Sequence, residues 1–123
     1  LNQTRDAIVA AGGNAPKGVR PPGGKINDAS KAVLAKAGMP SIVWSVDTLD
    51  WKTRNAQKTI DIVLSQVKDG DIVLMHDLYE QSAIAAETLI PELTKRGYQL
   101  VTVSEMAELR GGMAAGHSYG HFR

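Results

Sequence analysis

Helical and extended segments alternate along this 123-residue chain, and the alternation limits the folds that it can adopt. Apolar residues or caps at helical spacing predict helices over residues 1–11, 27–37, 60–67 and 86–97, and a further helix from Ser104. Short extended segments lie between them, at residues 17–20, 41–46, 72–75 and 100–103. This order predicts an α/β protein with four short parallel strands and right-handed crossovers.

Three details of these segments are also predicted. In the second helix, Ala29, Val33 and Ala37 share one face and are expected to be buried. Pro91 is expected to kink or break the helix that contains it. Residues 111–123 are rich in glycine and are expected to form an irregular tail after a domain spanning residues 1–110.

Composition excludes several classes of function. With 43% hydrophobic and 22% charged residues, the chain has the balance of a globular domain. Its formal net charge of +1 gives no electrostatic footprint for nucleic acid, and the absence of cysteine removes disulfides and thiolate metal sites. The longest apolar run, Ala7–Ala11, is far shorter than the roughly 20 residues of a membrane-spanning helix. We therefore expect neither a nucleic-acid partner nor a membrane span.

Polar and aromatic side chains follow the predicted strands at their carboxyl ends, where parallel sheets gather functional groups. Taken singly, most have a structural explanation, because an arginine before two prolines can anchor a loop and an aspartate can cap a turn. His76 follows an apolar strand, so it must either pair with a buried partner or face a cleft. The polar flanks of Trp51 favour a partly exposed ring that could stack on a sugar. The residues at these ends are Arg20, Asp47, Asp50, Trp51, His76 and Asp77.

Three segments together resemble known motifs. Arg20-Pro21-Pro22-Gly23, the segment 44–51 (Trp-Ser-Val-Asp-Thr-Leu-Asp-Trp) and the segment 72–77 (Ile-Val-Leu-Met-His-Asp) are similar to the third, fourth and fifth motifs of the NodB-homology polysaccharide deacetylases, carbohydrate esterase family 4. Their order and their placement after strands also match. The resemblance extends to about Leu109 and implies that residues 1–110 form the C-terminal part of an irregular (β/α) barrel.

The resemblance implies a hydrolytic site that removes N-acetyl groups. In the family a divalent metal, usually zinc, polarises the acetyl carbonyl, an aspartate acts as base and a histidine protonates the departing amine. His76 matches that histidine, Asp50 matches the carboxylate that holds and charges it, and Arg20 matches the residue that orients the base.

Three further residues match the substrate-binding part of the motifs. Leu74 matches the wall of the pocket for the acetyl methyl group, and Trp51 matches the aromatic side of the sugar groove. Gly23 lies where the family supplies a backbone N–H for the oxyanion. The family commonly has an aromatic residue at that position, so the shape of the groove is expected to differ here.

Two motifs of the family are absent from the sequence. The Asp-Asp pair that gives the base and one metal ligand is missing, and no His-rich motif precedes Arg20. The chain begins at Leu1 as if within a helix, so we expect an N-terminal half of the same domain to complete the site and to carry the metal ligands. The chain alone is expected to be inactive. His117 and His121 have the spacing of the second motif but the wrong order, and we interpret them as part of the tail.

Three hypotheses therefore stand. The leading one is a metal-dependent deacetylase of N-acetylglucosamine polymers such as peptidoglycan or chitin-like glycans, working outside the cell or at its wall; acetyl esters of xylan remain an alternative substrate. The second is a non-catalytic carbohydrate-binding or interaction domain on the same scaffold. The third is a metal hydrolase that uses Asp47, Asp50 and His76 as ligands.

Overall fold

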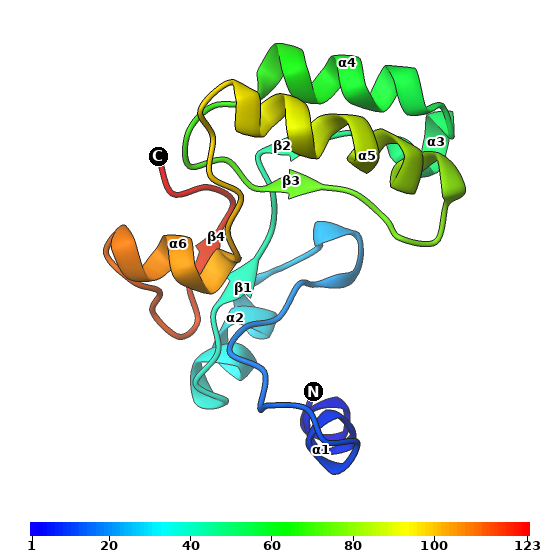
Figure 1. The fold of residues 1–123 in the computed structure, drawn as a ribbon. Coiled ribbons are helices and arrows are strands. Elements are labelled where there is room, and N and C mark those ends of the chain that lie inside the picture. Colours follow the sequence, from blue (N-terminus) through cyan, green and yellow to red (C-terminus); the bar gives the residue numbers. More distant parts are fainter. The chain divides into compact units, whose positions relative to one another are not determined.

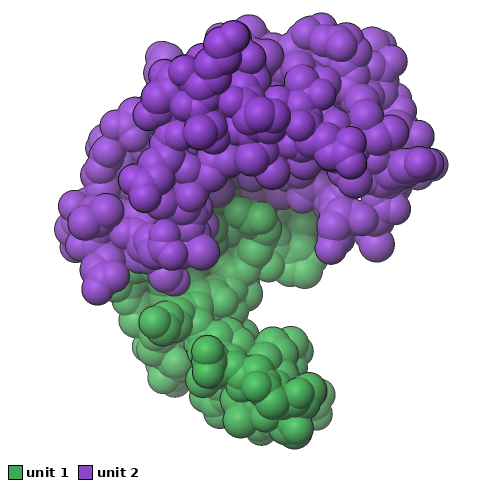
Figure 2. Space-filling view, viewed as in Figure 1, with its two compact units in different colours: residues 1–43, 113–119 green, residues 44–112, 120–123 purple.

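The computed structural model describes residues 1–123, which divide into two compact units. The first unit comprises residues 1–43 and 113–119, and the second comprises residues 44–112 and 120–123 (Figure 2). None of the helices combines the length and the apolar character needed to cross a membrane.

The first unit pairs its short strands in parallel. Strand β1 lies beside β4, with Ser41 opposite Ser118 and Ile42 opposite Tyr119, and Val19 forms a further parallel bridge with Ser41. The expected extended segment at residues 17–20 is thus reduced to a single bridge. The elements of the unit are α1 (Asn2–Ala10), the 3₁₀ turn η1 (Pro22–Gly24), α2 (Asp28–Lys36), β1 (Ser41–Ile42) and β4 (Ser118–Tyr119) (Figure 1).

Helix α2 confirms the predicted boundaries but not the predicted face. Asn27 caps it by accepting the Ser30 backbone N–H at 2.8 Å. Its buried residue is Leu34, whereas Val33 is 58% exposed. The predicted face of Ala29, Val33 and Ala37 is therefore wrong. Leucine buries more apolar area than alanine, and alanine marks either face of a helix equally well.

The second unit pairs its two strands in parallel and packs two helices against each other. Strands β2 and β3 align Val46 with Val73 and Asp47 with Leu74. Helices α4 and α5 lie side by side (Figure 1). The core between them consists of Ile60, Val63, Ala85, Leu89 and Leu93. The elements are β2 (Val46–Asp47), α3 (Asp50–Thr53), α4 (Ala56–Gln66), β3 (Val73–Leu74), α5 (Glu80–Lys95) and α6 (Val103–Leu109).

Pro91 does not break α5, which runs as one helix of 16 residues. Leu89 and Leu93 are both buried in the core on either side of Pro91. Each buried leucine contributes about 1.5–3 kcal/mol, which offsets the hydrogen bond that proline cannot donate. The alternative of a break at this position is therefore wrong, and the alternative of a kink stays a prediction.

Two predicted strands differ from the observed ones. The segment 41–46 divides into β1 and β2, which pair with different partners in different units. The strand predicted at residues 100–103 does not form, and α6 begins at Val103 instead. Thr102, and not Ser104, caps α6 by accepting the Glu105 backbone N–H at 3.2 Å. Leu100 and Val101 are 51% and 37% exposed, so the apolar character of this segment does not reflect burial in a sheet.

The glycine-rich tail is more ordered than the prediction of an irregular segment. Ser118 and Tyr119 form β4 in the first unit. In the second unit, Phe122 is buried and its backbone N–H donates to the Gly70 carbonyl at 2.7 Å. Gly70 has a φ of +89°, and a Cβ added there would lie 2.6 Å from the Phe122 carbonyl oxygen. Glycine at position 70 therefore permits the close approach of the tail.

Candidate active site

The carboxyl ends of β2 and β3 bring the fourth and fifth motif segments together. The two strands are parallel, so the loops that follow them leave the same edge of the pair. Beyond β2, the buried Thr48 hydroxyl donates to the Leu74 carbonyl at 2.7 Å and fastens the loop to β3. Asp50 begins α3 at the end of this loop, and His76 follows β3 with only Met75 between them.

Asp50 holds His76 through both the ring and the backbone. The imidazole Nδ1 lies 2.8 Å from Asp50 Oδ1, and the His76 backbone N–H donates to Asp50 Oδ2 at 2.6 Å. Because an ionised carboxylate only accepts hydrogen bonds, Nδ1 carries the proton of this contact, and Nε2 remains for other chemistry. The Asp50 side chain is 2% exposed, whereas that of His76 is 36% exposed. The two groups expected to share a pocket are thus in direct contact, and the ring is accessible.

The hydrogen bonds to Asp50 keep its carboxylate ionised despite its burial. Burial alone raises the pKa of Asp50, but the Ser82 hydroxyl and the side chain and backbone of His76 outweigh it. The pKa of Asp50 therefore lies below its ordinary value of 3.8. The site keeps a negative charge beside the imidazole at any pH near neutrality.

Two further donors complete the acceptor set of Asp50. The Trp51 backbone N–H donates to Oδ1 at 2.9 Å, and the Ser82 hydroxyl donates to Oδ2 at 2.7 Å. The motifs do not include Ser82. One signal in the sequence does point to it, because position 82 lies on the same helical face as Ala85, Leu89 and Leu93, where a hydroxyl needs a buried partner.

The turn that presents Asp50 is bounded by two residues in the left-handed region. Leu49 and Arg54, which flank α3, have φ angles of 54° and 45°. Asp47 Oδ1 accepts the Leu49 backbone N–H at 3.0 Å, so Asp47 stabilises the turn as the structural interpretation predicted. Non-glycine residues adopt this region at a cost, and strain of this kind concentrates at functional sites.

An aromatic side chain that the motifs do not contain lies near the imidazole, and a cationic side chain lies over that aromatic ring. The ring of Tyr79 is edge-on to His76, with 6.3 Å between the ring centroids. The guanidinium of Arg54 lies 4.8 Å from the centroid of the Tyr79 ring. Trp51 is 48% exposed, as its polar flanks predicted, and Leu74 is buried.

Arg20 and Gly23 belong to the first unit, whereas Asp50, Trp51, Leu74 and His76 belong to the second. Arg20 donates to the carbonyl oxygens of Ile42 at 3.4 Å and Val43 at 3.5 Å. Gly23 lies in η1 with a φ of +64°, a conformation that glycine adopts without strain. The second unit therefore brings together four of the six predicted site residues.

The residues of this chain do not form a metal site by themselves. No group of three or more His, Asp or Glu side chains is placed to hold a metal ion. Both oxygens of Asp50 are occupied by donors, and Asp47 Oδ1 serves the Leu49 turn. The hypothesis that Asp47, Asp50 and His76 are the ligands of a metal hydrolase is therefore contradicted. His117 belongs to the first unit and His121 to the second.

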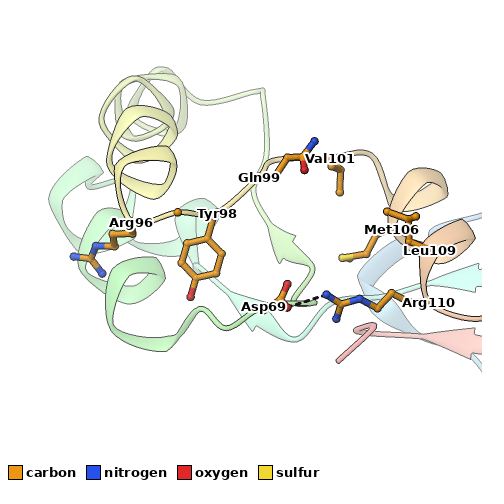
Figure 3. Close-up of a pocket in the computed structure, with 9 residues that line it drawn as sticks. Asp69, Arg96, Tyr98, Gln99, Val101, Met106, Leu109 and Arg110 are labelled. Carbon is orange, nitrogen blue, oxygen red and sulfur yellow. Dashed lines mark hydrogen bonds and ion pairs between the residues drawn. The ribbon is translucent and has the colours of Figure 1, made fainter.

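The second unit contains a pocket of about 430 Å³ that does not include the Asp50–His76 pair (Figure 3). It is lined by the segment 96–99, by residues of α6 and by Asp69, which pairs with Arg110 at 2.8 Å. Neither Asp50 nor His76 lines it. The exposed imidazole is thus outside this pocket.

Comparison with curated proteins links the chain to cell-wall deacetylases. It is 44% identical over 110 residues to the peptidoglycan-N-acetylmuramic acid deacetylase PdaC of Bacillus subtilis, covering 89% of this chain and 23% of that protein. It is 41% identical over 104 residues to the peptidoglycan-N-acetylglucosamine deacetylase PgdA of Listeria monocytogenes, covering 85% of this chain and 22% of that protein. The chain spans less than a quarter of the length of these relatives. No model of a known protein family matches the sequence.

Comparison with solved structures identifies deacetylases and esterases of similar fold. A structure described as a T48 deacetylase with substrate matches 97% of this chain and 58% of its own, with a TM-score of 0.88 and 37% identity. A family 4 acetyl xylan esterase from Clostridium thermocellum, in complex with a cobalt ion, matches 98% of this chain and 60% of its own, with a TM-score of 0.87 and 25% identity. The predicted fold class, α/β with parallel strands from part of an irregular (β/α) barrel, is confirmed.

Proposed function

We propose a function from the premise that the chain belongs to the polysaccharide deacetylases of carbohydrate esterase family 4. It is the C-terminal part of a catalytic domain that removes N-acetyl groups from peptidoglycan at the cell wall. Relatives named for peptidoglycan N-acetylmuramic acid and N-acetylglucosamine support this substrate class. The observation that carries the proposal is the 2.8 Å contact between Asp50 and an accessible His76.

His76 acts as the general acid of this reaction. Water gives a proton to the base of the preceding half as it attacks the acetyl carbonyl carbon. The C–N bond then breaks, and the nitrogen takes a proton from His76 Nε2 to leave as a free amine, with acetate as the other product. Nδ1 is held by Asp50 Oδ1, so Nε2 is the nitrogen left to donate. The buried carboxylate stabilises the imidazolium before the proton is transferred.

Four other residues shape the substrate site under this proposal. Leu74 forms a wall of the pocket for the acetyl methyl group, and the exposed ring of Trp51 stacks on a sugar. Arg20 orients the base, which lies in the preceding half of the domain. The backbone N–H of Gly23 donates to the oxyanion.

The metal ligands come from that preceding half, because the side chains of this chain do not group into a metal site. The metal supplies Lewis acidity at the acetyl carbonyl when it is bound. A family 4 esterase with a similar fold, described with a cobalt ion, supports a divalent metal, and the family resemblance favours zinc.

A completed domain tests the proposal. We define it as this chain joined to the preceding half of the domain, which PdaC of Bacillus subtilis can supply because of its 44% identity to this chain. Purified with zinc, it is expected to release acetate from N-acetylglucosamine oligomers and from peptidoglycan. The chain alone is expected to release none. Absence of acetate from the completed, metal-loaded domain would reject the proposal.

The second candidate function is a non-catalytic carbohydrate-binding domain, which the 48% exposed Trp51 favours. It predicts that oligosaccharides bind with the same affinity with or without metal, and that His76→Ala changes nothing. The enzyme is favoured because a pure binding module has no need of a carboxylate that holds a proton donor. Metal-dependent acetate release that His76→Ala abolishes distinguishes the two.

A further inference from the structure

Ser82 is a polar residue on the buried face of an amphipathic helix. It lies in the first turn of α5 and is 3% exposed. The same face carries Ala85, Leu89 and Leu93, which belong to the apolar core. A buried hydroxyl is costly unless it is hydrogen-bonded, so its partner indicates why it is there.

The partner of Ser82 is the carboxylate that holds His76. The Ser82 hydroxyl donates to Asp50 Oδ2 at 2.7 Å, and the His76 backbone N–H donates to the same oxygen at 2.6 Å. The other oxygen, Oδ1, receives the His76 ring and the Trp51 backbone N–H. Each oxygen therefore has two donors, which is close to the capacity of a carboxylate. Rotation of the carboxylate would break hydrogen bonds at both oxygens.

We propose that Ser82 is a positioning residue for the deacetylation reaction, which fixes the Asp50 carboxylate in the orientation that presents Oδ1 to the imidazole Nδ1 of His76. The proposal rests on the proposed function. Of the four donors, two come from His76 itself and one from the backbone next to Asp50. Ser82 is the one that comes from a separate helix, so it ties the Asp50–His76 pair to the rigid core of α4 and α5.

A second serine in the same unit offers a matched comparison. Ser45 donates to Asp71 Oδ1 at 2.9 Å, and the Asp71 side chain is 1% exposed. Asp71 also accepts hydrogen bonds from Lys68 and Arg123. Both aspartates have a lowered pKa that burial opposes and hydrogen bonds produce. Ser45 thus represents a serine that satisfies a buried carboxylate away from His76, and its hydroxyl also accepts the Ile72 backbone N–H at 3.1 Å.

Three other charged or titratable side chains are considered as alternatives to the Ser82 hydroxyl. Tyr79 packs edge-on against the His76 ring, and Arg54 lies over Tyr79. Asp77 follows His76 and is exposed. None of them donates to Asp50, so the effect of a Ser82 substitution is assigned to the lost hydroxyl.

The experiment compares Ser82→Ala with Ser45→Ala in the completed domain and in the 123-residue chain. In the completed domain, Ser82→Ala is expected to lower kcat by about 10- to 100-fold with KM unchanged, because the acid is misplaced in the transition state. The acid limb of the activity profile is expected to move to higher pH, since Asp50 loses a donor and its pKa rises. In the chain, NMR titration of the Asp50 side-chain carboxyl carbon is expected to show the same rise. Ser82→Thr, which keeps the hydroxyl, is expected to restore kcat.

Ser45→Ala is the control for Ser82→Ala, and the outcomes that would overturn the inference differ from the expected one. Ser45→Ala is expected to reduce thermal stability and to leave kcat and the acid limb unchanged. If Ser82→Ala behaves in the same way as Ser45→Ala, Ser82 is structural and the inference is wrong. If Ser82→Ala does not fold, Ser82→Cys keeps the side-chain size with a weak donor, and an unchanged kcat in that variant also overturns the inference. If the unmodified completed domain is inactive, the proposed function fails, and the Asp50 titration in the chain still shows whether the hydroxyl stabilises the carboxylate.

Discussion

Asp50 binds His76 twice, through Oδ1 to the imidazole Nδ1 at 2.8 Å and through Oδ2 to the backbone N–H at 2.6 Å. Two contacts from one carboxylate fix the position of the residue and the orientation of its ring together. They also assign the proton of the neutral imidazole to Nδ1 and leave Nε2 as the second nitrogen. The pair consists of a buried carboxylate and an accessible imidazole, whose side chains are 2% and 36% exposed.

Replacing Asp50 by asparagine is expected to lower kcat of the completed domain by about 10²- to 10³-fold. The amide group can donate to Nδ1 and so favour the wrong tautomer, and it carries no charge to stabilise the imidazolium. Thermal unfolding is expected to show a loss of about 1–3 kcal/mol, because one accepting oxygen cannot satisfy four donors. Asp71→Asn is the control, since it also alters a buried carboxylate but is expected to leave kcat unchanged. Equal kcat values for Asp50→Asn and the unmodified domain would contradict the role of Asp50.

The stability of the chain is expected to fall on acidification. Asp50 and Asp71 both have a pKa below the ordinary value of 3.8, since hydrogen bonds outweigh burial at Asp50 and, with the charge of Arg123, at Asp71. A lowered pKa in the folded state adds stability above the unfolded value, and this stability is lost as the pH falls through the folded value. Thermal unfolding measured between about pH 7 and pH 2 is expected to show the main loss below about pH 4. Asp71→Asn should reduce that loss, and a chain that grows more stable below pH 4 would contradict the assignment.

Gly70→Ala is expected to destabilise the chain by about 1–3 kcal/mol more than Gly97→Ala. Both glycines have a φ near +90°, so the backbone strain of the two substitutions is matched. The Cβ at position 70 would lie 2.6 Å from the Phe122 carbonyl oxygen, whereas that at position 97 meets nothing within 4 Å. The difference between the two variants in chemical denaturation therefore measures the docking of the tail. Equal losses would show that the tail contributes little.

The sequence predicts most of the helices and the acid–carboxylate pair, because both have local signals. Asn27 caps a helix at the predicted place, and apolar residues at helical spacing indicate a second helix, which begins at Ala56 and not at Ile60. His76 and Asp50 each follow a strand, and parallel strands bring such residues to one edge. The motif resemblance adds the pairing of the two.

The features that the sequence does not predict depend on contacts between distant residues. The segment 100–103 is apolar, but only pairing with another strand would make it a strand, and the Thr102 cap starts a helix instead. The tail is rich in glycine, and this composition predicts an irregular segment. It gives no sign that Phe122 is buried or that Arg123 forms an ion pair with Asp71. Ser82 is 32 residues from Asp50 along the chain, so its place on a helix face indicates a buried partner but not which residue that partner is.

The most direct test of the general acid measures the His76→Ala variant of the completed domain on two substrates that differ in their leaving group. An amine departs only when it is protonated, whereas 4-nitrophenolate leaves without a proton. His76→Ala is expected to lower kcat/KM for N-acetylglucosamine oligomers by about 10²- to 10⁴-fold, but for 4-nitrophenyl acetate by less than about tenfold. An equal loss for both substrates would contradict proton donation by His76.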